Sequence, residues 1–154
     1  GANEIDVVIS LGKFFSGFHT EVFDELSEIK AACGAAHLKV ILETGAMHNM
    51  KEIKQASLIA MNAEADFIKT STGKISRGAD VYSASVMLLA LREHYRKSGI
   101  IKGLKVAGGI REPLEAVKYK RLFEYFISDN IKLRNNFRIG CSRLFDALKS
   151  EIQK

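Results

Sequence analysis

Residues 66–74, with the sequence D-F-I-K-T-S-T-G-K, decide how the rest of the chain is interpreted. The stretch begins as an apolar strand and ends in a small, hydroxylated turn with a second lysine. Lys69 lies within the apolar part, where burying an unpaired ammonium costs several kcal/mol. A lysine in such a place tends to lose its proton, and a neutral amine forms Schiff bases with carbonyl compounds. Taken alone, Lys69 is more simply explained as a side chain that reaches from a strand end into water.

Charged residues recur in a comparable place on other strand-like runs. The other runs are residues 4–10, 38–44, 103–109 and 136–142. Three of these runs carry Asp6, Lys39 and Lys105, and together with Lys69 these residues follow one another at intervals of about 30 to 36 residues. Such an interval accommodates one strand, one helix and two loops, which predicts a parallel sheet alternating with helices. Charged residues on successive apolar strands then indicate one shared site.

Apolar residues at helical spacing predict the helices between these strands. Helices are expected at about residues 20–32, at 50–63 after an Asn49 cap, from 81 after an Asp80 cap, from Pro113, and over the last residues. Residues 11–17 and 129–136 are expected to be loops. The first of these helices is expected to bury Val22, Phe23, Leu26 and Ile29. The helix from Pro113 carries the apolar residues Leu114 and Val117, and the last helix presents Leu144, Phe145 and Leu148.

The segments resemble the deoxyribose-phosphate aldolase family, whose members are Schiff-base aldolases with a TIM barrel fold. The motifs occur in the family's order: G-A-N-E-I-D-V-V-I, L-K-V-I-L-E-T-G, D-F-I-K-T-S-T-G-K, L-K-V-A-G-G-I-R and F-R-I-G-C-S. The first motif resembles the family's fourth barrel strand. A complete barrel has about 250 residues. We therefore expect residues 1–154 to form a single α/β domain: an incomplete TIM (β/α)8 barrel with about the last five strand–helix units.

The resemblance implies a class I aldolase that reversibly cleaves 2-deoxy-D-ribose 5-phosphate to acetaldehyde and D-glyceraldehyde 3-phosphate. It implies that Lys69 is the Schiff-base lysine and that Lys105 is a second lysine, whose charge favours the neutral form of the first. It also implies that Asp6 takes part in proton relay and that Lys39 balances the charge. The alternative for Asp6 and Lys39 is a structural ion pair.

Small and basic residues predict a site for the substrate's phosphate. Glycines let backbone N–H groups approach an anion, and a helix N-terminus after the last strand adds further donors. Barrel enzymes often bind phosphate after their last two strands. The expected phosphate-binding residues are Gly73, Lys74, Gly108, Gly109, Ser142 and Arg143. Each glycine alone is more simply explained by a turn.

Composition sets further limits on the class of protein. The chain is 47% hydrophobic and 27% charged, which is the balance of an ordinary soluble protein. It has no basic stripe with interleaved aromatic residues, which disfavours nucleic-acid binding, and no apolar run approaching the ~18 residues of a membrane span. Two cysteines, Cys33 and Cys141, favour a reducing compartment such as the cytoplasm. The four histidines lack metal-ligand spacing, and the implied chemistry needs neither metal nor cofactor.

Two alternatives to this function stay open. One is a related Schiff-base aldolase that takes another sugar phosphate. The other is a catalytically silent partial barrel that binds phosphate ligands or other chains. Five strands cannot close a barrel of eight. We therefore expect the two outer strands to be unpaired on one side, with Val7, Ile9 and Ile139 on an apolar inner face that meets water. A homo-oligomer is compatible with such edges.

Overall fold

The computed structural model describes residues 1–127 and 133–152 of the 154-residue chain. Within these ranges, one sheet contains parallel strands in sequence order. The strands are β1 (Glu4–Val8), β2 (His37–Ile41), β3 (Phe67–Lys69), β4 (Gly103–Ala107) and β5 (Phe137–Gly140). Neighbouring parallel strands joined by helices are the repeating units of a TIM barrel. The expected partial barrel of five strand–helix units is confirmed.

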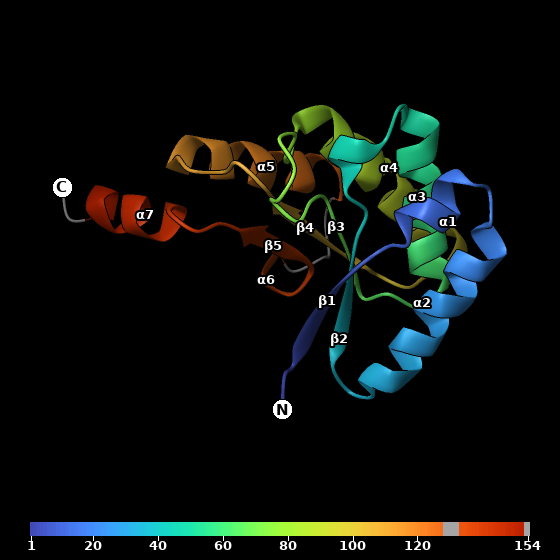
Figure 1. Cartoon of the computed structure of the whole chain (residues 1–154). Coiled ribbons are helices and arrows are strands. Elements are labelled where there is room, and N and C mark those ends of the chain that lie inside the picture. Colours follow the sequence, from blue (N-terminus) through green and yellow to red (C-terminus); the bar gives the residue numbers. More distant parts are fainter. Residues whose placement is uncertain (128–132, 153–154) are drawn as a thin grey trace.

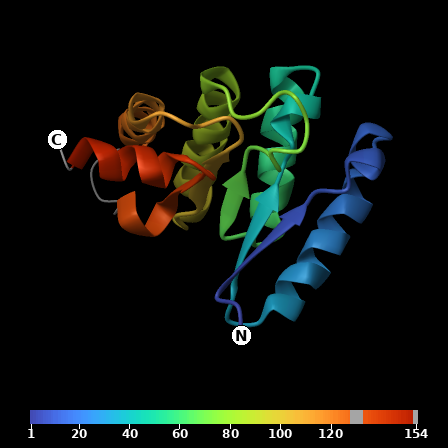
Figure 2. The ribbon, with the colours of Figure 1, turned by 60° about the vertical axis from the view of Figure 1, so that its left-hand side comes forward.

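The four longest helices follow one another along one side of the sheet (Figures 1 and 2). The helices are α1 (Leu11–Phe15), α2 (His19–Cys33), α3 (Met50–Asn62), α4 (Val81–Ser98), α5 (Pro113–Phe126), α6 (Leu133–Asn136) and α7 (Leu144–Ile152), with a 3-10 turn η1 (Thr44–Ala46). The predicted caps are confirmed: Asn49 accepts a hydrogen bond from Glu52 N at 3.0 Å, and Asp80 accepts one from Ser83 N at 2.8 Å. Such side chains satisfy backbone donors that have no partner within the helix. No helix in residues 1–127 and 133–152 has both the length and the apolar character to cross a bilayer.

The two faces of the sheet differ because side chains alternate along each strand. One set of alternate positions is apolar, almost fully buried and packed into a core with residues of the helices. This set includes Leu38, Val40, Ile68, Leu104 and Val106. The intervening positions on the same strands point away from the helices, and they carry the charged residues singled out in the sequence. The strand pattern therefore separates an apolar core from a polar open face.

The expectation of an apolar inner face at the outer strands was wrong. Val7 and Ile139 pack against the helix-side core, and Ile9 belongs to that core. The reason is the period of two along a strand: because Asp6 points to the open face, Val7 must point to the helices. The open face of the outer strands therefore carries the charged residues Glu4, Asp6 and Arg138, together with the exposed Val8.

Several other expectations differ from the structure. The expected loop at 11–17 contains α1, and the expected connection at 129–136 contains α6, although residues 128–132 lie outside the described ranges. Strand β2 ends at Ile41, and Thr44 begins η1. Not every apolar helix residue is buried, since Leu114 is 81% exposed and Phe23 and Phe145 are also exposed. The buried face of each of these helices is therefore narrower than the apolar periodicity of the sequence predicts.

Candidate active site

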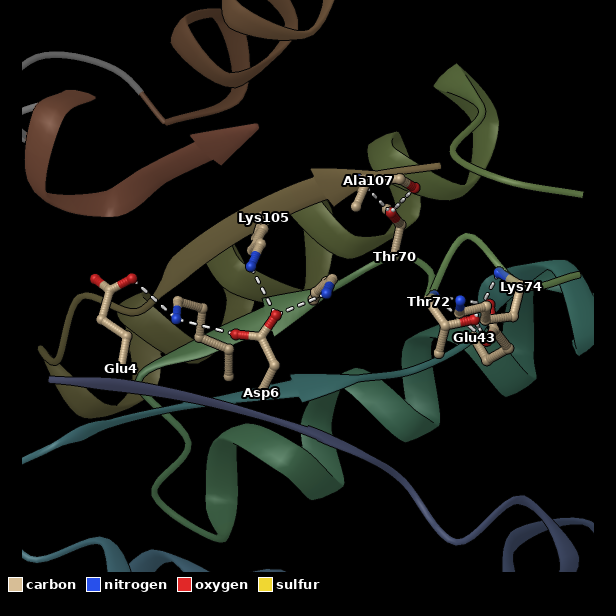
Figure 3. Close-up of polar contacts among 10 residues, drawn as sticks. Glu4, Asp6, Glu43, Thr70, Thr72, Lys74, Lys105 and Ala107 are labelled. Atoms are coloured by element: carbon tan, nitrogen blue, oxygen red, sulfur yellow. Dashed lines mark hydrogen bonds and ion pairs between the residues drawn. The ribbon is translucent and has the colours of Figure 1, made fainter. Parts of the chain in front are cut away.

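Asp6 is the centre of a charged cluster on the open face of the sheet (Figure 3). Its Oδ2 accepts hydrogen bonds from Lys69 Nζ and Lys105 Nζ, each at 2.6 Å, and its Oδ1 accepts one from Lys39 Nζ at 3.0 Å. The strand register places Asp6 beside Lys39 and Lys69 beside Lys105. The structure therefore brings together all four residues that the sequence suggested as catalytic.

Two further charged residues extend this cluster to the far edge of the sheet. Glu4 Oε2 lies 2.9 Å from Lys39 Nζ, and Glu4 Oε1 lies 3.1 Å from Arg138 Nη2. Glu4 is on β1 and Arg138 is on β5, so the sheet curves enough for its two outer strands to interact. Neither residue was predicted, although Glu4 is two positions from Asp6 and therefore shares its face.

The cluster is partly shielded from solvent. The side chain of Lys69 is 11% exposed and that of Asp6 is 25% exposed. Burial by itself would raise the pKa of Asp6, but hydrogen bonds from Lys105, Lys69 and Lys39 outweigh burial and hold this pKa well below its usual range. Asp6 is therefore ionised at neutral pH, and it accepts hydrogen bonds from all three lysine side chains.

Thr70 keeps the two central lysines side by side after β3 has ended. Its Oγ1 donates to Ala107 O at 3.0 Å and accepts from Ala107 N at 2.9 Å (Figure 3). Its backbone N–H donates to Lys105 O at 3.1 Å. The fully buried Thr70 side chain thus takes the place of a backbone group in the ladder between β3 and β4. This structural role explains the first threonine of the K-T-S-T motif, Thr70.

A cavity of about 490 Å³ opens beside the cluster at the carboxyl ends of β3, β4 and β5, and its lining includes Lys69 and Lys105. In a parallel barrel, this is the end of the strands at which active sites are built. The predicted phosphate-binding residues that line this cavity are Gly73, Lys74, Gly108, Gly109 and Ser142. Arg143 is not among the described residues that line it. Thr72, Arg111 and Gly140 line the cavity and were not predicted.

The three predicted glycines lie in turns that favour glycine. Their φ angles are 79° at Gly73, 97° at Gly108 and 85° at Gly109. Side chains with a Cβ rarely adopt this region, whereas glycine enters it freely. Arg111 could have been recognised because it is a cation directly after the A-G-G turn. The turns therefore bring backbone amides and basic side chains to one cavity.

A slightly larger cavity, of about 530 Å³, lies on the outside of the molecule between α3 and α4. Its lining includes Met50, Leu89 and Arg92 and none of the residues around Asp6. It has neither the paired lysines nor the glycine turns. Residue chemistry, and not volume, therefore identifies the cavity above β3 and β4 as the candidate active site.

Known proteins share this combination of sequence and fold. The chain is 41% identical over 152 residues to the deoxyribose-phosphate aldolase of Mus musculus, which covers 99% of the chain and 48% of the relative. It is 42% identical over 147 residues to that of Agrobacterium fabrum, covering 95% and 55%. The chain thus spans about half the length of these relatives.

A solved structure gives the same result for the fold. The tetrameric deoxyribose phosphate aldolase of Aeropyrum pernix superimposes with a TM-score of 0.71 at 28% identity, covering 99% of the chain and 56% of that structure. The sequence model of the DeoC/LacD family of aldolases matches residues 1–134. These residues include β1 to β4 and the Asp6, Lys39, Lys69 and Lys105 cluster. The chain therefore belongs to the DeoC/LacD aldolase family.

Proposed function

We propose that this chain carries the catalytic centre of a class I aldolase that reversibly cleaves 2-deoxy-D-ribose 5-phosphate to acetaldehyde and D-glyceraldehyde 3-phosphate. The observation that carries the proposal is the convergence of Lys69 and Lys105 on one oxygen of Asp6, beside a cavity lined by glycine turns. The names of the Mus musculus and Agrobacterium fabrum relatives support this substrate.

Lys69 is the nucleophile of the proposed reaction. Its neutral amine attacks the aldehyde carbon C1 of the open-chain sugar, and loss of water leaves an iminium ion. The C3 hydroxyl then loses its proton and the C2–C3 bond breaks. The electron pair of that bond forms an enamine, and glyceraldehyde 3-phosphate departs. Protonation of the enamine at C2 and addition of water release acetaldehyde and regenerate the lysine.

Lys105 and Asp6 serve Lys69 in this scheme. The Lys69 and Lys105 nitrogens both lie 2.6 Å from the same carboxylate oxygen, so the positive charge of Lys105 is a close neighbour of the Lys69 amine. A neighbouring positive charge favours the neutral form of an amine, which is the nucleophilic form. Asp6 relays protons during loss of water and enamine formation. Lys39, between Asp6 and Glu4, balances the charge of the two carboxylates.

The phosphate of the substrate occupies the other part of the cavity in this proposal. The turns at Gly73, Gly108 and Gly109 provide backbone N–H groups that donate hydrogen bonds to this phosphate. Lys74 and Ser142 add charge and hydrogen bonds, whereas Arg143 follows Ser142 without lining the cavity. None of these steps requires a metal or a cofactor.

Reductive trapping tests the proposed function directly. Incubation with acetaldehyde and borohydride should add one reduced two-carbon group, located at Lys69 by mass spectrometry of peptides. Lys69→Arg should give no adduct, since a guanidinium does not form the imine. An adduct located only at Lys105 or Lys74 would reverse the proposed roles.

A second candidate function is a silent partial barrel that binds phosphate ligands or other chains. The observation that favours it is the pair of outer strands, β1 and β5, in a chain that spans about half the length of its relatives. Phosphate binding without any adduct at Lys69 would support this candidate. An aldolase for another sugar phosphate would form the adduct but turn over a different member of a substrate panel.

The assembly and compartment belong to the same proposal. We propose a homo-oligomer, in keeping with the tetramer described for the Aeropyrum pernix relative, and sedimentation velocity measures it. Cys33 and Cys141 are free thiols, which is the usual state of cysteines in the reducing cytoplasm. We place the reaction there, in carbohydrate catabolism.

A further inference from the structure

Glu43 is a buried carboxylate beside the candidate phosphate turn and has no role in the scheme above. It lies between the end of β2 and η1, and only 5% of the residue is exposed. Burying a carboxylate is costly unless donors compensate it. The partners of Glu43 therefore indicate why it is present.

Both donor groups of Thr72 point to the Glu43 carboxylate (Figure 3). Thr72 N donates to Oε1 at 3.1 Å, and Thr72 Oγ1 donates to Oε2 in a short contact. Thr72 Oγ1 in turn accepts a hydrogen bond from Lys74 N at 3.1 Å. Because a carboxylate only accepts hydrogen bonds, it fixes the direction of the Thr72 hydroxyl. The oxygen of that hydroxyl is thereby left free to accept from Lys74 N.

The backbone at Glu43 is held in a conformation that glutamate rarely adopts. Its φ is 52° and its ψ is 56°, in the left-handed region, which costs on the order of 1 kcal/mol or more for a residue with a Cβ. Hydrogen bonds on either side fix this conformation: Leu42 N donates to Lys69 O and Thr44 N donates to Thr70 O, each at 2.9 Å. The fold therefore maintains a strained residue that aims its carboxylate at the loop after β3.

These contacts determine which amide of the turn is available to a ligand. The N–H groups of Thr72 and Lys74 are used within the turn, whereas Gly73 N–H has no hydrogen-bond partner among the residues that the structure describes. Gly73 lines the cavity. We propose that Glu43 is a positioning residue that orients the 72–74 turn for a phosphoryl anion. That this anion is the phosphate of the substrate rests on the proposed function.

The direction in which Glu43→Gln changes the affinity for phosphate distinguishes a positioning role of Glu43 from a simple effect of its charge. Glu43 brings a negative charge close to the anion site, so charge alone predicts that Glu43→Gln tightens phosphate binding. Positioning predicts the opposite, because glutamine replaces one of the two accepting oxygens with an NH2 group that can only donate, which weakens the hold on Thr72. We expect Glu43→Gln to weaken binding of inorganic phosphate about tenfold, as expected for loss of a charge-assisted hydrogen bond. The measurement is a titration followed by the amide NMR signals of Gly73, Gly108 and Gly109.

One further variant, Thr72→Val, keeps this test decisive if Glu43→Gln fails to fold. Thr72→Val removes the hydroxyl partner and should weaken phosphate binding to a similar extent. A folded double variant should bind no more weakly than the weaker single variant, since the two residues act through one contact. Glu52→Gln is the matched control: Glu52 accepts a hydrogen bond from His48 N at 2.7 Å but does not line the cavity. It should bind phosphate as the unmodified chain does.

Reductive trapping separates this inference from the proposed function. If no adduct forms at Lys69 but phosphate binding still weakens in Glu43→Gln, the inference stands and the aldolase proposal fails. If the adduct forms and Glu43→Gln binds phosphate as tightly as before, or more tightly, the inference is overturned and the aldolase proposal stands. In an active enzyme, Glu43→Gln should raise KM for the phosphorylated sugar more than KM for unphosphorylated deoxyribose, which has no phosphoryl group for the turn to bind.

Discussion

Ile68 and Lys69 are neighbours on β3, yet they serve the two faces of the sheet in different ways. Ile68 is fully buried in the core between the sheet and the helices. Lys69 points to the open face and donates to Asp6 at 2.6 Å. One residue along the chain thus separates a position that stabilises the fold from a position that we propose carries out the chemistry.

The two faces are held by different forces. On the helix side, closely packed apolar groups such as Leu104 and Val106 leave little room for change. On the open side, the Asp6 carboxylate accepts hydrogen bonds from three lysine side chains, and these bonds depend on the charge of Asp6 and therefore on pH. A substitution on one face should therefore affect stability or chemistry with little effect on the other, and the following predictions test that separation.

The largest expected effect is on chemistry, from Lys105→Leu. This change removes the charge beside Lys69, and we expect turnover of the deoxyribose phosphate at pH 7 to fall by roughly 10³-fold while the fold is retained. Lys105→Arg keeps the charge without the compact ammonium and should recover only part of the loss. Lys102→Leu is the matched control, since Lys102 Nζ contacts Glu64 O and lies outside the cluster. Near-normal turnover by Lys105→Leu would show that the charge of Lys105 does not activate Lys69.

The next effect should be on stability alone. Ile68→Ala removes a fully buried side chain, and we expect it to lower the free energy of unfolding by about 3 kcal/mol, measured by urea denaturation. The control is Val8→Ala on the open face of β1, where the side chain is exposed and the expected change is under about 0.5 kcal/mol. Equal losses for the two variants would contradict the assignment of the faces.

The sequence predicted the strands and the shared cluster because both depend on simple periods. Strand–helix units of similar length placed the five strands in order, and the position of each charge within its apolar run brought Asp6, Lys39, Lys69 and Lys105 together. The family resemblance gave the roles, which stay predictions until they are tested. The strand order and the charged cluster could therefore be predicted from the sequence.

What the sequence did not predict depends on contacts between distant segments. The Glu43 contact with Thr72 requires a left-handed residue after β2, which no local pattern indicates for glutamate. The contact between Glu4 and Arg138 requires the curvature of the whole sheet. Leu114 is apolar and at helical spacing, yet exposed, because periodicity identifies a stripe without showing what covers it. These features are properties of the tertiary arrangement.

A third prediction concerns the pH dependence of the open face. The pKa of Asp6 is lowered in the folded chain from its ordinary value of 3.8, so its contribution to stability is complete above about pH 5 and is lost progressively as the pH falls below that. We expect Asp6→Asn to be less stable than the unmodified chain at pH 7, and the difference to shrink as the pH is lowered from 5 to 3. Thermal unfolding at several pH values measures it. A difference that stays constant over this range would show that the Asp6 charge does not stabilise the fold.

The smallest expected effect, and the most direct probe of sheet curvature, is the coupling between Glu4 and Arg138. Their side chains are 33% and 32% exposed and their charged atoms are 3.1 Å apart. Partly exposed ion pairs contribute about 0.5 kcal/mol. A double-mutant cycle with Glu4→Gln and Arg138→Gln should give this coupling energy, and about 1 M salt should largely remove it.

A local ion pair serves as the benchmark for that cycle. Lys120 and Glu124 are one turn apart on α5, at 2.5 Å, so their coupling of about 0.3–0.5 kcal/mol depends on the helix alone. The coupling between Glu4 and Arg138 depends in addition on β1 and β5 staying close across the open face. If the outer strands separate in solution, this coupling disappears while that of Lys120 and Glu124 is retained. Equal coupling energies for the two pairs would show that the curvature that gathers the charged cluster persists in solution.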